Sequence, residues 1–277
     1  MSFFEKLSNG WRISLYSFSV LRENKSLIIF PILSAVSMIL IFGSVITAVL
    51  ASNGWTAANF DVNNRTLDYI LVFLFYLVNY FIVVFFNMAL IHCTRLYFHG
   101  QRPKVADGIR FSLSRVRSIF AWAVLAAIVG TILRIIQENV GSLGKIITGL
   151  IGVVWNIAAF FVVPVIAYEN LGPVDAIKRS ASMMKQKWGE SLGATFSFGL
   201  IHFIAVLVVA GSLFVMGSFI NVVLGIALAV LGVLVLAAIF SAAQTIFVSS
   251  VYHEVTGDPV AKFNEAFADS LFVSKKS

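Results

Sequence analysis

Charged residues are scarce in this chain of 277 residues: they make up 12% of it, whereas 59% is hydrophobic. A soluble domain contains about 25% charged residues, and a fold this poor in charge would expose a large apolar surface to water. The scarcity therefore excludes an ordinary soluble domain and predicts that lipid surrounds most of the molecule. The 26 phenylalanines agree with that interpretation.

Cysteine is nearly absent, and several motifs of enzyme chemistry are missing. The single cysteine, Cys93, excludes an intramolecular disulfide. The sequence has no P-loop, no dinucleotide-binding glycine fingerprint and no HExxH zinc motif. Arg134 and Glu138 lie four residues apart, and an exposed ion pair explains them. We therefore expect a protein that is not an enzyme, with no catalytic, cofactor-binding or metal-binding residues and no cofactor.

Apolar runs long enough to cross a membrane are abundant, and a helix needs about 20 such residues. No Asp, Glu, Lys or Arg occurs over 191–253, and one helix of that length would be roughly three times as long as the hydrocarbon core is thick. The run must therefore turn back, and Gly217, Ser218 and Asn221 are suited to break it. The predicted spans are 27–51, 69–93, 117–136, 146–168, 191–216 and 220–252.

These spans predict an all-α polytopic membrane protein, with 1–277 as a single membrane domain. All but three of the 20 Lys and Arg residues fall on the side of the two termini, the exceptions being Arg65, Arg134 and Lys145. The positive-inside rule then places both termini in the cytoplasm of a bacterial or archaeal cell. This topology accounts for the net charge of +7, so we expect no nucleic-acid partner.

The segments on the basic side resemble one another and predict amphipathic helices over 2–20, 104–116, 173–187 and 261–273. The last three share a tyrosine, a turn containing proline, an acid–small–apolar triplet and a serine (Ser112, Ser180 and Ser270). An apolar face at helical spacing includes Val116 in the first of them. The pattern predicts three parallel hairpin repeats, each preceded by an amphipathic helix, rather than an inverted repeat.

Basic residues on these helices are candidate contacts for anionic lipid headgroups, which attract each cation by about 1 kcal/mol, or for a protein partner on the cytoplasmic side. The candidates are Arg110, Arg115, Arg117, Lys178, Arg179, Lys185 and Lys187.

Polar residues within the spans form a second group of candidates, because intramembrane polar groups often carry function. They are Asn79, Asn87, Asn156, His202 and Gln244. Such residues also hold bundles together through hydrogen bonds between helices, so cross-linking of the bundle and a polar path both remain open. In the fourth span Pro164 predicts a kink, which is either static or a hinge.

The opening segment, with Trp11, Lys25, Phe30 and Pro31, resembles an uncharacterised prokaryotic family of six-span membrane proteins known only as a domain of unknown function. More distantly, Ala176, Ile177, Ser180 and Lys185 are similar to a pattern in the membrane domain fused to some glycerophosphodiester phosphodiesterases. The first resemblance implies six spans and leaves function open, and no phosphodiesterase domain accompanies the second.

Two functions follow as expectations. The first is a non-enzymatic bundle that binds lipid or serves as a scaffold through its basic helices. The alternative is a transporter or channel component whose path passes Asn79, Asn156 and His202.

Overall fold

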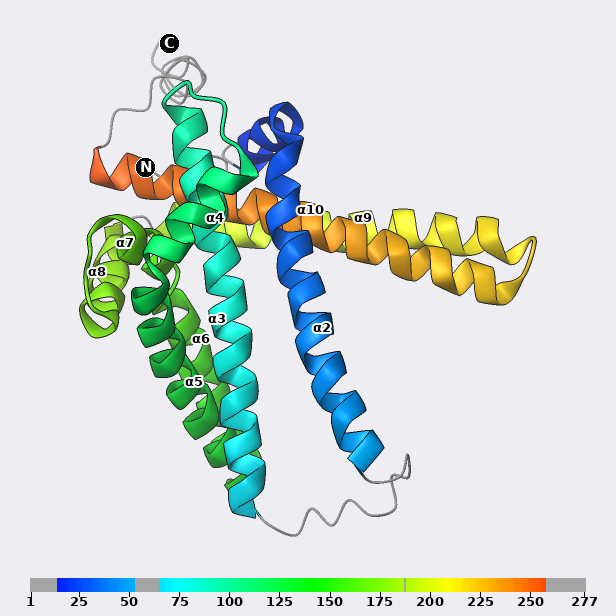
Figure 1. Cartoon of the computed structure of the whole chain (residues 1–277), viewed down its shortest axis with the longest axis horizontal. Helices are drawn as coiled ribbons and strands as arrows, with labels where there is room; N and C mark the ends of the chain where they lie inside the picture. Colours follow the sequence, from blue (N-terminus) through cyan, green and yellow to red (C-terminus); the bar gives the residue numbers. More distant parts are fainter. Residues whose placement is uncertain (1–13, 53–64, 187, 258–277) are drawn as a thin grey trace. The chain divides into compact units, whose positions relative to one another are not determined.

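The computed structural model describes residues 14–52, 65–186 and 188–257, which are helical apart from short turns and contain no strand (Figure 1). Six of the described helices are long and apolar enough to cross a membrane, so the predicted all-α, multi-pass membrane protein is confirmed. Residues 14–23 are also helical. The remaining helices are η1 (Lys25–Ile28), α2 (Ile29–Ser52), α3 (Arg65–Phe98), α4 (Val105–Ser114), α5 (Val116–Asn139), α6 (Ser142–Ala158), α7 (Val162–Tyr168), α8 (Pro173–Gln186), α9 (Trp188–Ser218) and α10 (Val222–Thr256).

The long uncharged segment turns back where the sequence predicts it. Helix α9 ends at Ser218, and Asn221 caps α10 because its side-chain oxygen accepts a hydrogen bond of 2.8 Å from the backbone N–H of Val223. Helix α10 has 35 residues and is about 52 Å long at the usual rise. It exceeds a hydrocarbon core of about 30 Å, as the length of the predicted sixth span implies.

The amphipathic helices predicted over 104–116 and 173–187 correspond to α4 and α8. One boundary is wrong: Val116 begins α5 rather than sharing the apolar face of α4. The reason is that Arg115 leaves the helical conformation, with φ −108° and ψ 11°. The helix predicted over 261–273, and most of the one over 2–20, lie outside the described residues.

Contacts divide the chain into two compact bodies, each described by itself. The first body comprises the described residues of 14–31, 90–108 and 183–257. The second body comprises those of 32–89 and 109–182.

In the first body α9 and α10 lie side by side (Figure 1), and glycines bring their ends close together. A Cβ added to Gly225 would lie 2.5 Å from Ser218 Oγ and 2.7 Å from the carbonyl oxygen of Phe214. Near the other end of the pair, the rings of Phe198 and Phe247 meet with centroids 5.9 Å apart. Tight backbone contact of this kind is common between membrane helices, where small residues permit close approach.

Two tyrosines, the buried Tyr97 and the half-buried Tyr16, link the N-terminal part of the first body to the end of α3. The hydroxyl of Tyr97 donates a hydrogen bond of 2.5 Å to Glu23. Tyr16 lies nearby, and burial together with the negative charge of Glu23 raises the pKa of Tyr16 to about 12. Both effects keep Tyr16 neutral in the folded protein.

In the second body the fourth span is interrupted, as Pro164 predicts. Helix α6 ends at Ala158 and α7 begins at Val162, because a proline cannot donate to the preceding turn and its ring crowds that turn. The interruption leaves the backbone N–H of Phe161 without a helical partner, and Ser180 Oγ of α8 accepts it at 2.8 Å. Ser180 is fully buried, so its hydroxyl satisfies a donor that water does not reach.

Ser112, the serine at the matching place in α4, also holds its helix to a preceding span. Its hydroxyl donates a hydrogen bond of 2.9 Å to the carbonyl oxygen of Phe85 in α3. Ser270 lies outside the described residues. The threefold repeat therefore stays a prediction, although two of its three serines have a comparable structural role.

Candidate functional site

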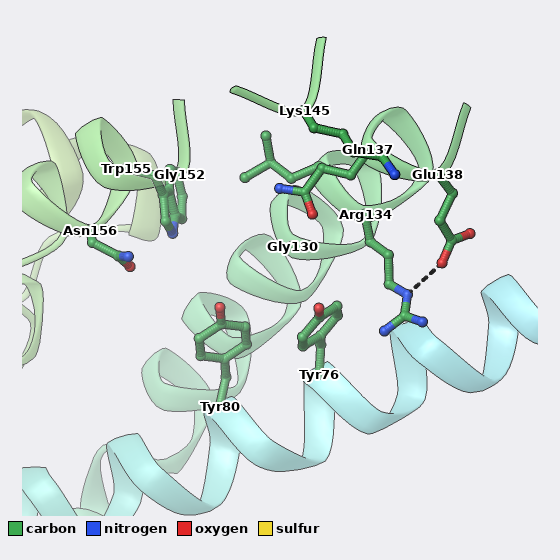
Figure 2. A pocket seen from close by; sticks show the side chains of 11 residues that line it. Tyr76, Tyr80, Gly130, Arg134, Gln137, Glu138, Lys145, Gly152, Trp155 and Asn156 are labelled. Carbon is green, nitrogen blue, oxygen red and sulfur yellow. Dashed lines mark hydrogen bonds and ion pairs between the residues drawn. The ribbon is translucent and has the colours of Figure 1, made fainter. Parts of the chain in front are cut away.

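Helices α3, α5 and α6 of the second body line an open cavity of about 670 Å³ (Figure 2). Most of its lining side chains are polar or aromatic, which is unusual within apolar spans. The cavity is lined by Tyr76, Tyr80, Gly130, Leu133, Arg134, Gln137, Glu138, Lys145, Gly152, Trp155 and Asn156.

Two cations and one carboxylate lie at the end of the cavity where α5 passes into α6. Arg134 Nε lies 2.8 Å from Glu138 Oε1, with the two side chains 51% and 43% exposed. Lys145 adds the second positive charge from the first turn of α6, whose N-cap, Gly141, offers no side-chain acceptor. The three formal charges leave a net charge of +1, and the positive end of the α6 dipole has the same sign.

Tyrosines of α3 form the opposite wall. In Figure 2, Tyr76 and Tyr80 rise from α3 with their hydroxyls directed away from that helix, toward the side where α5 and α6 lie. They are four residues apart, so they share one face of the helix. A Cβ added to Gly130 of α5 would lie 3.4 Å from the ring of Tyr76, so α5 packs closely against that ring.

A pair of tryptophans links α5 to α6 beside the cavity. The rings of Trp122 and Trp155 stack with centroids 5.7 Å apart and planes 3° apart. Asn156 follows Trp155 and is exposed toward the cavity. From Lys145 to Asn156 the lining extends about 16 Å along α6, or roughly half the thickness of a hydrocarbon core. The cavity therefore carries polar groups from one end of the spans to about their middle.

Of the residues predicted to form a polar path, Asn156 lines this cavity. Asn79 belongs to the same body, and its amide approaches Met38 Sδ at 3.9 Å. Asn87 is half-buried in the part of α3 that belongs to this body.

His202 and Gln244 belong to the first body. His202 stacks on Phe240 with centroids 4.6 Å apart, and its buried Nε2 has no hydrogen-bond partner among the described residues. Gln244 is exposed. The predicted path includes residues of both bodies, and each body is described by itself, so the path stays a prediction.

The predicted cytoplasmic contacts fall into two groups, and the first stabilises the second body from within. Arg115 Nη1 donates a hydrogen bond of 2.7 Å to Asn170 Oδ1. Arg179 Nε donates to both carboxylate oxygens of Glu169, at 2.9 and 3.2 Å. Exposed side chains belong to Arg110, Arg117, Lys178 and Lys185, and Lys187 lies outside the described residues.

Reasoning from the sequence identified the ion pair of the cavity but missed its tyrosines. A signal was available in the helical register. Tyr76 and Tyr80, and likewise Gly152 and Asn156, are spaced four apart on one face of an apolar helix. That signal indicates a polar stripe on each helix, although it does not say that the stripes face one another.

The sequence led us to expect no GxSxG motif, and that expectation is wrong at the level of the pattern, which occurs at Gly189, Ser191 and Gly193. In hydrolases this pattern places a nucleophilic serine at a sharp turn between a strand and a helix. Here the three residues lie within α9, Trp188–Ser218. The pattern therefore lacks the turn on which a nucleophile elbow depends.

A model described as a family of unknown function, DUF6159, matches residues 66–260. No curated protein matches the chain. The matched segment includes every residue that lines the cavity.

Proposed function

The chain belongs to this family of unknown function, and we propose that it is a non-enzymatic membrane protein that binds a lipid in the cavity of its second body. One observation carries the proposal: a cavity of about 670 Å³, with charged and polar side chains among its lining residues, runs from the end of the spans to about their middle. Its volume lies within the range of about 300–1,000 Å³ that is usual for small-molecule sites.

Lipid is the ligand favoured by the surroundings of this cavity. Polar side chains within a hydrocarbon core are costly unless they find partners. A lipid can offer the oxygens of its headgroup and of its esters to Tyr80, Gln137 and Asn156 while its acyl chains stay against the apolar outer faces of the helices. On α6 those faces include Leu150 and Val154, which are 61% and 65% exposed.

The sidedness of the site follows from the charge distribution. The positive-inside rule puts both termini in the cytoplasm, so the end of the cavity with Arg134 and Lys145 opens on the outer face of a bacterial or archaeal cytoplasmic membrane. The exposed cations of the opposite side, among them Arg110 and Arg117, are then available to anionic lipid or a protein partner. Nucleic acid has no part in this proposal.

A transporter or channel component is the second candidate, and the position of Asn156 favours it. This residue belongs to the predicted polar path and also lines the cavity near the middle of the fourth span. Under this alternative, proteoliposomes of the purified protein carry a solute flux that Asn156→Leu abolishes. A flux that survives the substitution would count against the path.

Filling the cavity tests the lipid proposal. Gly152 lines the cavity, and a Cβ added there meets no atom within 4 Å, so Gly152→Leu places a side chain in the cavity without a clash. Native mass spectrometry of gently extracted wild-type protein is expected to show one retained lipid. The variant should retain at least tenfold less, because its side chain occupies the same space.

Gly149→Leu is the matched control. Gly149 lies on the same helix, is exposed, meets nothing within 4 Å of an added Cβ and does not line the cavity. The Gly149→Leu substitution changes helix propensity as much as Gly152→Leu does, and this variant should retain lipid as the wild type does. Wild-type protein released without lipid, or lipid kept equally by Gly152→Leu, would refute the proposal.

A further inference from the structure

The charge of the cavity identifies the class of lipid, an inference that rests on the proposed lipid site. Arg134 and Lys145 contribute two positive charges and Glu138 one negative charge. The net charge of +1 lies at the end of the spans, on side chains that are exposed, and it attracts a ligand of opposite charge. A ligand that carries one negative charge would neutralise it.

Several lipid classes fit this charge poorly. A neutral glyceride leaves the positive charge in place. A phosphomonoester carries a charge of about −1.5 to −2 at pH 7 and reverses the sign of the imbalance. A fatty acid has the right charge, but its carboxylate offers two oxygens to a cavity of about 670 Å³ that has many more polar groups. A phosphodiester combines a single negative charge with several acceptor oxygens.

The donors of the cavity are arranged for such a group. Arginine has five N–H donors, and Arg134 directs Nε to Glu138 and also interacts with the Tyr76 hydroxyl. Lys145 approaches from α6, and in Figure 2 its amine lies on the same side of the cavity as Gln137 and Arg134. A phosphate placed near these residues receives charge-assisted hydrogen bonds, which are roughly twice as strong as neutral ones.

Deeper in the cavity the lining changes from charged to neutral. Tyr80, Trp155 and Asn156 carry hydroxyl, indole and amide groups but no formal charge. These groups can donate hydrogen bonds to the ester oxygens of the glycerol backbone, which lies deeper in a leaflet than the phosphate. An ammonium on the headgroup would cancel the charge of the phosphate and leave the positive charge of the cavity in place. We infer that the cavity binds a glycerophospholipid with a monoanionic phosphodiester and an uncharged headgroup, its phosphate lying near Arg134 and Lys145.

The test is a competition between headgroups on the same acyl chains. Wild-type protein in neutral detergent is offered equal amounts of phosphatidylglycerol, phosphatidylethanolamine and phosphatidylcholine, and the bound lipid is read by native mass spectrometry. We expect phosphatidylglycerol to exceed each of the others at least tenfold. Equal retention of the three would overturn the inference while leaving the lipid proposal intact, whereas no retention at all would overturn both.

Variants of the charged residues test whether the cavity causes the preference for phosphatidylglycerol. Arg134→Gln with Lys145→Gln should abolish it, and Glu138→Gln should keep or strengthen it because a repulsive charge is removed. Arg102→Gln with Lys104→Gln removes two exposed cations from a loop outside the cavity and should change nothing. If the first double variant does not fold, Lys145→Gln alone, at an exposed position, replaces it and should weaken the preference. A preference that survives in the cavity variants would refute the inference.

A last arm separates a lipid from a soluble phosphodiester. Inorganic phosphate and glycerophosphoglycerol, which lacks acyl chains, are titrated against bound phosphatidylglycerol. We expect neither to displace the lipid at a hundredfold excess, because the acyl chains anchor it in the bilayer or micelle. Displacement by glycerophosphoglycerol at equal concentration would show that the ligand is a soluble phosphodiester and would overturn its assignment as a lipid.

Discussion

Two helix pairs of similar hydropathy, α5 with α6 and α9 with α10, pack in different ways. The helices of both pairs are long and apolar enough to cross a membrane. In the second pair Gly217 and Gly225 approach so closely that a Cβ on Gly217 would lie 2.6 Å from the Cα of Gly225. In the first pair the contact is made by the stacked rings of Trp122 and Trp155.

The size of the residues at the contact explains the difference. Glycines let two backbones meet, which closes a pair of helices without leaving space. In the first pair the contact is between large aromatic rings, and the cavity of the second body lies beside it. Composition alone therefore does not distinguish a closed pair from one that can hold a ligand, whereas the residues at the contact do.

The largest expected effect comes from opening the closed pair. Gly225→Leu places side-chain atoms where Ser218 and the backbone of Phe214 already lie, and backbone cannot move aside as a flexible side chain can. We expect a loss of about 3 kcal/mol in the free energy of unfolding. Titration of sodium dodecyl sulfate into mixed micelles, followed by circular dichroism, measures it.

Gly211→Leu provides the comparison for that variant. Gly211 lies in α9, is exposed and has no atom within 4 Å of an added Cβ. The substitution should leave the unfolding free energy unchanged or raise it slightly, because leucine favours a helix more than glycine does. Similar losses in the two variants would mean that backbone contact does not hold this pair together.

A smaller effect is expected where side-chain hydrogen bonds hold the second body. Ser180→Ala leaves the N–H of Phe161 buried without its acceptor. An unsatisfied buried donor costs about 1–3 kcal/mol, so we expect the same titration to show a loss of about 2 kcal/mol. Ser182→Ala, an exposed position on the same helix, should cost less than about 0.5 kcal/mol. Equal behaviour of the two variants would contradict the structural role of Ser180.

Much of the fold follows from local signals in the sequence. Uncharged runs located all six spans, Asn221 and its neighbours located the turn between the last two, and Pro164 located the interruption of the fourth. Each of these signals acts within a few residues, because helix propensity, capping and the loss of an N–H are local effects. The end of α4 was misjudged, since apolar spacing continues to Val116 although the helix turns at Arg115.

The candidate site was harder to predict, because it depends on which faces of three helices meet. The sequence indicated Asn156 as a polar residue within a span and Arg134 with Glu138 as an ion pair. No local pattern, however, shows that these residues face Tyr76 and Tyr80 of α3. The same limit explains why Arg115 and Arg179 were taken for lipid contacts. Their partners, Asn170 and Glu169, are distant in the sequence or on another element.

The smallest expected effect concerns those partners, and it compares two ion pairs near one end of the second body. Arg179 and Glu169 are 39% and 23% exposed, whereas Lys178 and Asp175 are 73% and 67% exposed. Solvent screens an exposed pair almost completely. Glu169→Gln should therefore lower the unfolding free energy by about 1 kcal/mol, allowing for partial screening, and Asp175→Asn by less than about 0.5 kcal/mol. Because Arg179 Nε donates to both carboxylate oxygens, 1 M salt should weaken this pair only in part. Equal losses, or a loss in Glu169→Gln that vanishes in salt, would mean that the Arg179–Glu169 pair stabilises the second body no more than an exposed ion pair does.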